Sequence, residues 1–131
     1  MYKKDKKMGR AVIEGNLHFV FLTSRCQEVF LEETKEVAED VLRQKLEESG
    51  LDTLHVECLG FIMLISVRMS EDKSPSAIAY IVRKAGKDVL TEIKKVQSNG
   101  MQHLLSERYY VSTELPTNTR ILQFIEEETG R

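Results

Sequence analysis

The chain has 131 residues and a formal net charge of −2, with 31% charged and 41% apolar residues. This length suits one domain with a sizeable core, and this composition excludes a disordered chain. No stretch approaches the ~20 consecutive apolar residues of a membrane-crossing helix, and no apolar region follows the basic start as it would in a signal peptide. We therefore expect a single cytoplasmic domain over residues 1–131, with no membrane partner and with both cysteines as free thiols.

The first twelve residues form a basic segment that we expect to be flexible. Within residues 1–10, the basic side chains outnumber the single acid Asp5; they are Lys3, Lys4, Lys6, Lys7 and Arg10. Charge is also segregated later in the chain, since residues 31–49 are mainly acidic and residues 83–95 mainly basic. Such segregation can give a protein of low net charge one basic face. Ordinary solvated helix faces would produce the same pattern.

The first half of the chain predicts a strand, a helix and two further strands. Residues 16–23 (NLHFVFLT) are rich in β-formers and apolar on both faces, which is typical of a strand that is covered on both sides. Apolar residues recur at helical spacing over residues 31–49, which predicts a helix. Residues 53–58 and 61–69 predict the second and third strands, joined by a tight connection.

The second half predicts a helix, a strand and a final helix. Ser74 can cap a helix that has Pro75 at its first position and runs to about Lys95. Residues 107–113 are typical of a fourth strand, and residues 118–128 predict a short last helix. The order β-α-β-β-α-β-α is that of an α+β fold: a ferredoxin-like split βαββαβ antiparallel sheet with a C-terminal helix. This plan leaves one sheet face bare, so the last helix or a second subunit must cover it.

Five stretches, in this order and at this spacing, match a known pattern: LHFVFLTSR, LHVECLGFIMLIS, SPSAIAYIVRK, RYYVST and ILQFIEEE. Together they resemble the single-tyrosine His-hydrophobic-His transposases of small bacterial insertion sequences, the IS200-like superfamily. The resemblance covers residues 16–128. It implies recognition of imperfect hairpins in single-stranded DNA by two subunits that form one unit, joined through the last strand with the final helix exchanged.

The resemblance also implies an active site that this sequence has lost. Members of the family hold a divalent metal with two histidines one residue apart on one strand, so that both share a face. The matching positions are Phe61 and Met63, which offer no donor atom for a hard cation and which we expect to fill the former metal site. The family's nucleophilic tyrosine matches Phe124 and a glutamine ligand matches Glu128. We therefore expect no enzyme activity, catalytic residue, metal or cofactor.

A relative without catalysis could still bind structured single-stranded nucleic acid, so we expect a DNA or RNA hairpin as the partner, in a regulatory role. Lysine and arginine would contact its phosphates. The expected nucleic-acid-binding residues are Lys3, Lys4, Lys6, Lys7, Arg10, Arg25, Arg83, Lys84, Lys87 and Arg108. Of these, Arg25 and Arg83 match positions at which the family is commonly basic.

Other interpretations of the sequence remain open. A ferredoxin-like module that binds a protein or a small ligand would need no nucleic acid. Tyr109 or Tyr110 could replace the lost nucleophile, and His55 with Glu57 could belong to a metal site, but neither has recognisable partners. His18 is more typical of a hydrogen-bonded core residue. A homodimer is expected in each case, because the strand RYYVST could pair with its symmetry mate.

Overall fold

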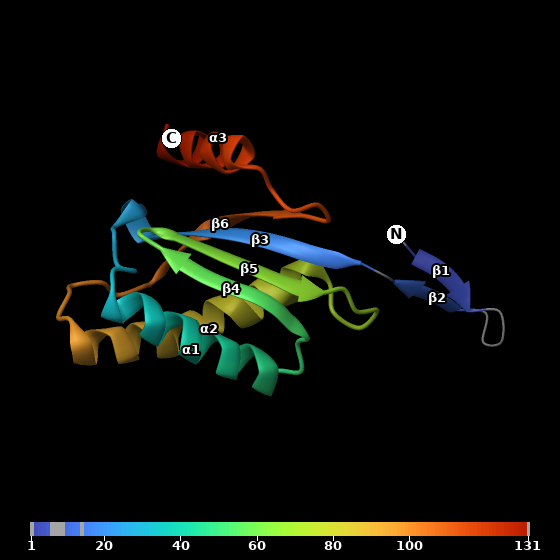
Figure 1. Ribbon diagram of the computed structural model, residues 1–131, viewed down its shortest axis with the longest axis horizontal. Helices are drawn as coiled ribbons and strands as arrows, with labels where there is room; N and C mark the ends of the chain where they lie inside the picture. The colour runs from blue at the N-terminus through green and yellow to red at the C-terminus, as the bar shows by residue number, and fades with distance from the viewer. Residues whose placement is uncertain (1, 6–9, 14, 131) are drawn as a thin grey trace.

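The structure, a computed structural model, describes residues 2–5, 10–13 and 15–130 (Figure 1). Its elements are β1 (Tyr2–Asp5), β2 (Arg10–Ile13), β3 (Asn16–Thr23), the 3-10 turn η1 (Ser24–Cys26), α1 (Glu33–Glu48), β4 (Thr53–Leu59), β5 (Ile62–Arg68), α2 (Pro75–Val96), β6 (Leu105–Ser112) and α3 (Asn118–Thr129). From β3 onward, this order confirms the predicted sequence of elements and the α+β class. None of the described helices combines the length and the apolar character needed to span a membrane.

One antiparallel sheet of four strands forms the centre of the molecule, in the order β4-β5-β3-β6. α1 and α2 pack side by side across one face of this sheet, and α3 lies over the other face (Figure 1). The inner strands β5 and β3 are apolar on both sides because helices cover both sides. β4 and β6 are the two edges of the sheet.

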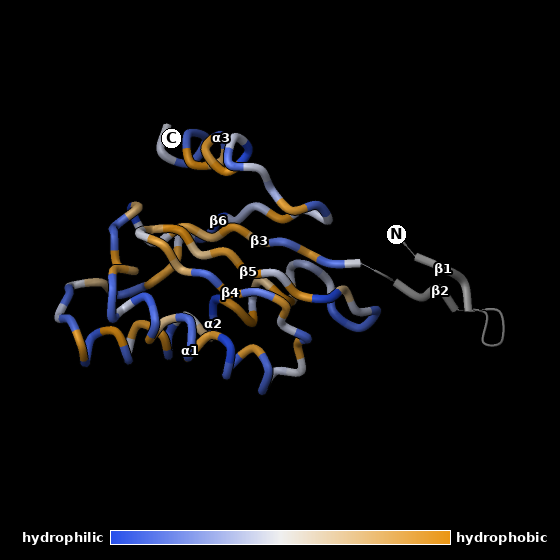
Figure 2. The backbone as a smooth tube through the Cα atoms, viewed as in Figure 1, coloured by the Kyte–Doolittle hydropathy of each residue, from blue (hydrophilic) through white to orange (hydrophobic). Residues whose placement is uncertain are grey.

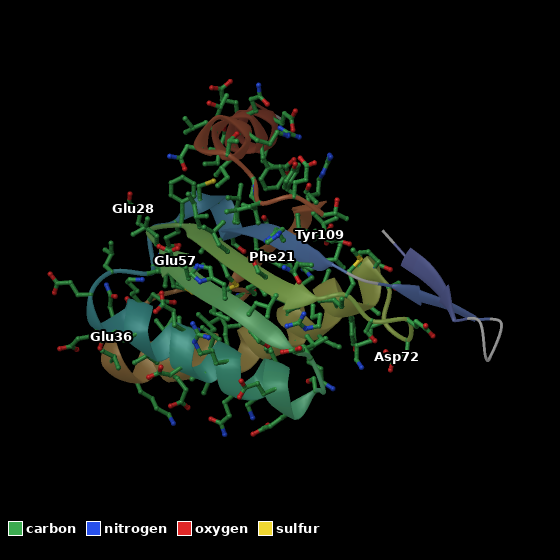
Figure 3. All side chains as sticks on the ribbon, turned by 45° about the vertical axis from the view of Figure 1, so that its right-hand side comes forward. Phe21, Glu28, Glu36, Glu57, Asp72 and Tyr109 are labelled. Atoms are coloured by element: carbon green, nitrogen blue, oxygen red, sulfur yellow. The ribbon has the colours of Figure 1, made fainter. Side chains whose placement is uncertain are left out.

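The larger hydrophobic core lies between the sheet and the pair α1 and α2. Alternate residues of β3 point into it, namely Leu17, Phe19 and Phe21. Phe21 also stacks on Tyr109 of β6, with 5.5 Å between the ring centroids (Figure 3). Hydrophobic residues are concentrated along the strands (Figure 2). Ring pairs of this kind add to the stabilisation from buried area, and here they attach the edge strand β6 to the centre of the sheet.

A smaller core lies on the opposite face of the sheet, beneath α3. Val20 and Leu22 of β3 are buried here together with Phe124 of α3, which is only 4% exposed. The ring of Tyr110 lies 6.1 Å from that of Phe124, centroid to centroid. The last helix therefore covers the face that the split βαββαβ plan leaves bare, which is one of the two covers that the sequence allowed.

Side-chain caps determine where α2 and α3 begin. Ser74 Oγ accepts a hydrogen bond from the backbone N–H of Ala77 at 3.1 Å, and Pro75 takes the first helical position. Thr117 Oγ1 accepts from the backbone N–H of Arg120, also at 3.1 Å. Each cap satisfies an N–H that has no partner within its helix. The predicted start of α2 is confirmed by this geometry.

α1 covers the outer edge of β4. The carboxylate of Glu39 accepts a hydrogen bond from the backbone N–H of Cys58 at 2.8 Å, and Arg43 Nη2 donates to the carbonyl of Val56 at 3.4 Å. The ammonium of Lys35 lies 2.5 Å from the Glu39 carboxylate. Unpaired backbone groups at a sheet edge are a template for a further strand. Side chains of α1 occupy two of those groups on β4.

The N-terminal segment contains structure that the sequence did not predict. β1 and β2 pair as a separate antiparallel hairpin, with Tyr2 opposite Ile13 and Asp5 opposite Arg10. The sequence predicts no strand within residues 1–12. Neither strand alternates apolar and polar residues, because YKKD is mainly charged and RAVI is mainly apolar, so this hairpin gives no periodic signal.

Candidate nucleic-acid interface

The two positions matched to the metal-binding histidines, Phe61 and Met63, do not share a face. Phe61 lies in the turn before β5 and packs in the smaller core beneath α3. Met63 is fully buried in the larger core under α1 and α2. The prediction that both side chains fill one former metal site is therefore wrong. The physical reason is the turn, because strand alternation starts at Ile62, the first residue of β5.

Ile62 and Leu64 are the apolar residues of β5 that pack beneath α3. They stand one residue apart on one face, which is the arrangement that the resemblance requires of a histidine pair. Both side chains are pure hydrocarbon and supply no lone pair to a cation. Whichever of the two residue pairs is matched to the family's histidines, the matched side chains are therefore apolar.

The two adjacent tyrosines of β6 belong to different cores. Tyr110 packs beneath α3, where the guanidinium of Arg120 lies 4.7 Å from its ring centroid in a cation–π contact. Tyr109 faces the other way, where its ring stacks on Phe21 and packs at a tilt against Phe19. Within the described residues, no group of three or more His, Cys, Asp and Glu side chains is arranged to hold a metal ion.

Glu128, matched to the family's glutamine, lies beside Arg108. The Nε of Arg108 is 3.4 Å from Oε2 of Glu128. Glu128 and Cys26 help to line a pocket of about 300 Å³ at the end of α3. Burial, together with the nearby Glu128 charge, raises the pKa of the Cys26 thiol, which favours the weakly nucleophilic protonated form. Arg108 thus lies on the α3 side of the sheet, away from the cations of α2.

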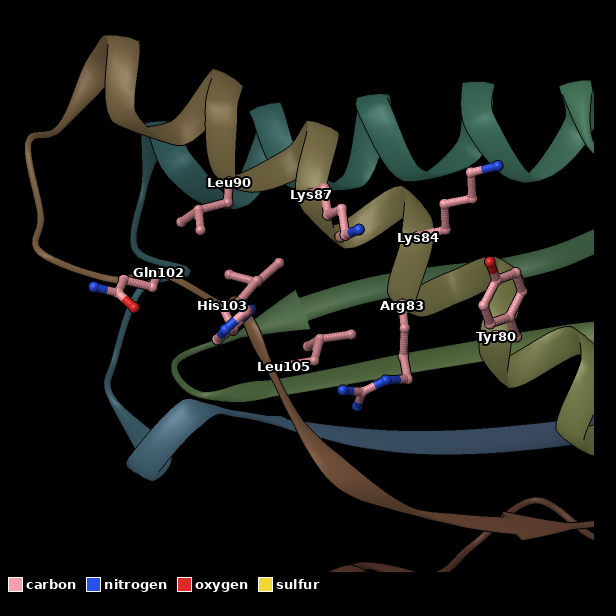
Figure 4. A pocket seen from close by; sticks show the side chains of 10 residues that line it. Tyr80, Arg83, Lys84, Lys87, Leu90, Gln102, His103 and Leu105 are labelled. Atoms are coloured by element: carbon pink, nitrogen blue, oxygen red, sulfur yellow. The ribbon is translucent and has the colours of Figure 1, made fainter.

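Three of the predicted cations come together on α2. Arg83, Lys84 and Lys87 line a pocket of about 400 Å³ between this helix and residues 102–105 (Figure 4). Arg83 is fixed toward β6, because its Nη1 donates a hydrogen bond to the carbonyl of Ser106. The described residues that line the pocket include no aspartate or glutamate. A concave surface with charges of one sign concentrates anionic ligands.

The same pocket contains two residues that the sequence analysis did not select. Tyr80 stands at one end and His103 at the other (Figure 4). Tyr80, Arg83, Lys84 and Lys87 are spaced i, i+3, i+4 and i+7, which places all four side chains on one helix face. That spacing could have identified Tyr80. His103 comes from a loop far along the chain, and no local pattern predicts that meeting.

Arg25 lies next to the α2 pocket but not within it. It has a left-handed backbone, with φ 57 and ψ 24, inside η1, which costs a non-glycine residue about 1 kcal/mol. Arg25 lines the pocket beneath α3 and also a hollow of about 440 Å³ that it shares with Gln102 and His103. Both of these residues also line the α2 pocket. The loop that carries them therefore connects Arg25 to the cations of α2.

The remaining predicted cations are those of the N-terminal segment. Lys6 and Lys7 lie outside the described residues. Lys3 and Lys4 belong to β1 and Arg10 belongs to β2, where the structure describes the backbone. A contact between these five residues and nucleic acid stays a prediction.

The histidines of the sheet have local partners. His18 Nδ1 lies 2.7 Å from Ser66 Oγ on the neighbouring strand. Burial lowers the pKa of His18, which favours the neutral ring at pH 7. His55 Nε2 lies 3.2 Å from Glu57 Oε1 in an exposed contact. The interpretation of His18 as a hydrogen-bonded structural residue is confirmed.

Comparison with known proteins places this fold among transposase structures. No family model and no curated protein matches the sequence. The structure is similar to that of a protein provisionally named as a transposase from Deinococcus radiodurans R1, with a TM-score of 0.74 and 19% identity over 98% of each chain. It is also similar to a REP-associated tyrosine transposase bound to a REP hairpin, with a TM-score of 0.52 and 10% identity over 90% of this chain and 70% of that one. These likenesses confirm, for the fold, the resemblance to IS200-like transposases.

Proposed function

We propose that this protein binds structured single-stranded nucleic acid, DNA or RNA, in the cytoplasm and does not cleave it. The α2 pocket carries this proposal, because three cations converge there and no carboxylate lines the described part of its wall. Such cations contact phosphates and give binding that weakens with salt. One protein of similar fold is a transposase bound to a REP hairpin, which supports a hairpin as the first ligand to test.

The side chains on the sheet face beneath α3 lack the chemistry that cleavage needs. Ile62 and Leu64 occupy the β5 face beneath α3, and Phe124 lies over it on the last helix. Metal-assisted phosphoryl transfer needs donor atoms that hold a cation and a hydroxyl that attacks, and none of these three side chains has either. A protein that occupies a hairpin without cutting it would compete with an active transposase for that site, so we assign it a regulatory role.

We further propose that two copies form the working unit. β6 is the edge strand that α1 does not cover, and two large apolar residues remain exposed after it, Leu115 at 72% and Leu122 at 58%. Isologous pairing of β6 with its symmetry mate would satisfy the edge of the strand and bury these leucines.

The test is a titration of a labelled hairpin with single-stranded flanks, followed by fluorescence anisotropy at two salt concentrations. We expect measurable affinity at low salt. Three phosphate contacts to a single strand predict a salt slope of about −2, or an affinity about twentyfold lower at ~200 mM than at ~50 mM salt. The double variant Lys84→Gln/Lys87→Gln should bind about tenfold more weakly and reduce the slope by about 1.4.

A matched control is available on the same helix. Lys94 and Lys95 are exposed and lie outside the pocket. The variant Lys94→Gln/Lys95→Gln removes the same charge and should bind nearly as the unmodified protein does. If both double variants lost the same affinity for the hairpin, binding would depend on the net charge of the protein alone. That result would contradict a binding site at the α2 pocket. No binding of any hairpin at low salt would reject the function and favour a protein-interaction or small-ligand module on this fold.

A further inference from the structure

The α2 pocket holds an exposed aromatic ring among its cations. Tyr80 is 67% exposed, although most large apolar side chains of the described residues are buried. Its ring has no stacking partner among the described aromatic residues. A tyrosine ring offers a large rigid surface at low entropic cost, so its position beside Arg83, Lys84 and Lys87 calls for a ligand with a flat face.

The floor and rim of the pocket differ in character. Leu90, Leu104 and Leu105 line it and are themselves nearly buried, which gives the floor an apolar surface. Gln102 and His103 supply hydrogen-bonding groups at the end opposite Tyr80 (Figure 4). An apolar floor with a few polar groups is typical of small-molecule sites.

The cations on this rim are available to a ligand. Lys84 and Lys87 are exposed, and within the described residues neither forms an ion pair. Arg83 is only half-exposed, and its bond to the Ser106 carbonyl holds it close to β6. The side chains of Lys84 and Lys87 can therefore move to contact a bound phosphate, whereas Arg83 is already held at the wall of the pocket.

We propose that this pocket takes one unpaired nucleotide of the single strand that flanks a hairpin, with its base against Tyr80 and the leucine floor and its phosphate against Lys84 and Lys87. This assignment rests on the proposed function and specifies its ligand. A base within a duplex hides both faces in the stack, so only an unpaired base can lie on the ring. The volume of about 400 Å³ suits one nucleotide and is at the low end for ligand sites.

The test compares two substitutions of one residue on two ligands. Tyr80→Ala removes the ring and Tyr80→Phe retains it. The ligands are a hairpin with single-stranded flanks and the same hairpin with blunt ends. We expect Tyr80→Ala to bind the flanked hairpin about tenfold more weakly, Tyr80→Phe to bind it normally, and both to bind the blunt hairpin as the unmodified protein does. An abasic site at one flank position should reproduce the loss in the unmodified protein.

Further measurements distinguish a failure of the nucleotide pocket from a failure of the proposed function. Val96→Ala, at an exposed apolar residue of α2 outside this pocket, is the control, and circular dichroism checks that each variant is folded. If Tyr80→Ala binds normally while Lys84→Gln/Lys87→Gln does not, the nucleotide pocket is wrong and nucleic-acid binding stands. Equal loss on flanked and blunt hairpins would also overturn the pocket. If the unmodified protein binds neither hairpin, the proposed function itself fails.

Discussion

At the scale of single residues, Phe124 stands where the resemblance places a nucleophile. Its ring is 4% exposed and packs with Tyr110, Val20 and Leu22 between α3 and the sheet. A hydroxyl group added to this ring would be transferred on folding from water into an apolar environment. The residue thus serves the stability of the smaller core, and restoring a tyrosine tests whether any chemistry remains there.

We predict that Phe124→Tyr gains no cleavage activity and loses about 1–2 kcal/mol of stability, because a buried hydroxyl without a partner is costly. Urea unfolding measures the second effect. The first is measured by incubating a labelled single-stranded hairpin with the variant and manganese, then separating the products on a denaturing gel. The unmodified protein is the control. A covalent protein–DNA band in either lane would contradict the proposal that cleavage is absent.

On the third predicted strand, the sequence predicted the strand itself but not which face of the sheet each residue occupies. The apolar run correctly predicted a buried strand in this region, but the start of β5 at Ile62 depends on the turn formed by Gly60 and Phe61. Gly60 has a φ of +64, a conformation that glycine adopts readily. A shift of one residue moves every side chain to the other face. For this reason Met63 lies in the opposite core from Phe61, although the two matched positions were expected to share a face.

At the scale of elements, the contact between α1 and β4 has a measurable pH dependence. Burial alone would raise the pKa of Glu39, but the Cys58 N–H and the Lys35 ammonium together hold it below its ordinary value. A carboxyl whose pKa is lowered by folding stabilises the folded state at neutral pH, and this stabilisation is lost as the pH falls through its folded pKa.

We predict that Glu39→Gln lowers the free energy of unfolding by about 1 kcal/mol at pH 7, the difference between a charged and a neutral hydrogen bond. The difference should shrink below the ordinary glutamate pKa of 4.5 as Glu39 becomes protonated in the unmodified protein. Urea titrations at several pH values measure it. Glu47→Gln, at an exposed glutamate of the same helix, is the control. A difference that does not depend on pH would contradict the assignment.

The elements were predictable where their signals are local. The apolar periodicity of α1 and α2, and the Ser74 cap with Pro75, lie within a few residues of each other in the sequence. The bond from Cys58 to Glu39 spans 19 positions, and its formation depends on the packing of α1 beside β4. No spacing rule relates the two residues. Contacts between elements are accordingly the part of the fold that required the structure.

At the scale of the whole molecule, the proposed pairing of two copies makes a prediction about mass. Sedimentation velocity at micromolar concentration should show a dimer. The variant Leu115→Lys/Leu122→Lys should shift the protein toward a monomer without loss of thermal stability, because both leucines are exposed and would bring like charges together in the interface. Leu54→Lys, at an exposed leucine of the opposite edge strand β4, should remain dimeric. A monomer for the unmodified protein would reject the pairing.

The α2 pocket also belongs to this scale, because it combines distant parts of the chain. The sequence placed Arg83, Lys84 and Lys87 in a basic stretch, and the structure brings Gln102 and His103 to the same wall. The net charge of −2 gives no sign of the positive charge in this pocket, because acidic residues elsewhere in the chain balance it. The total charge of a protein therefore says little about a site of this size.

The cover over β4 limits how far such a sheet can grow. With Glu39 and Arg43 bonded to its backbone, β4 offers a poor place for another chain to add, and β6 alone is left to extend the sheet. In two molecules joined through β6, the combined sheet would have a blocked β4 strand at each outer edge, so growth of this sheet would end at a closed pair.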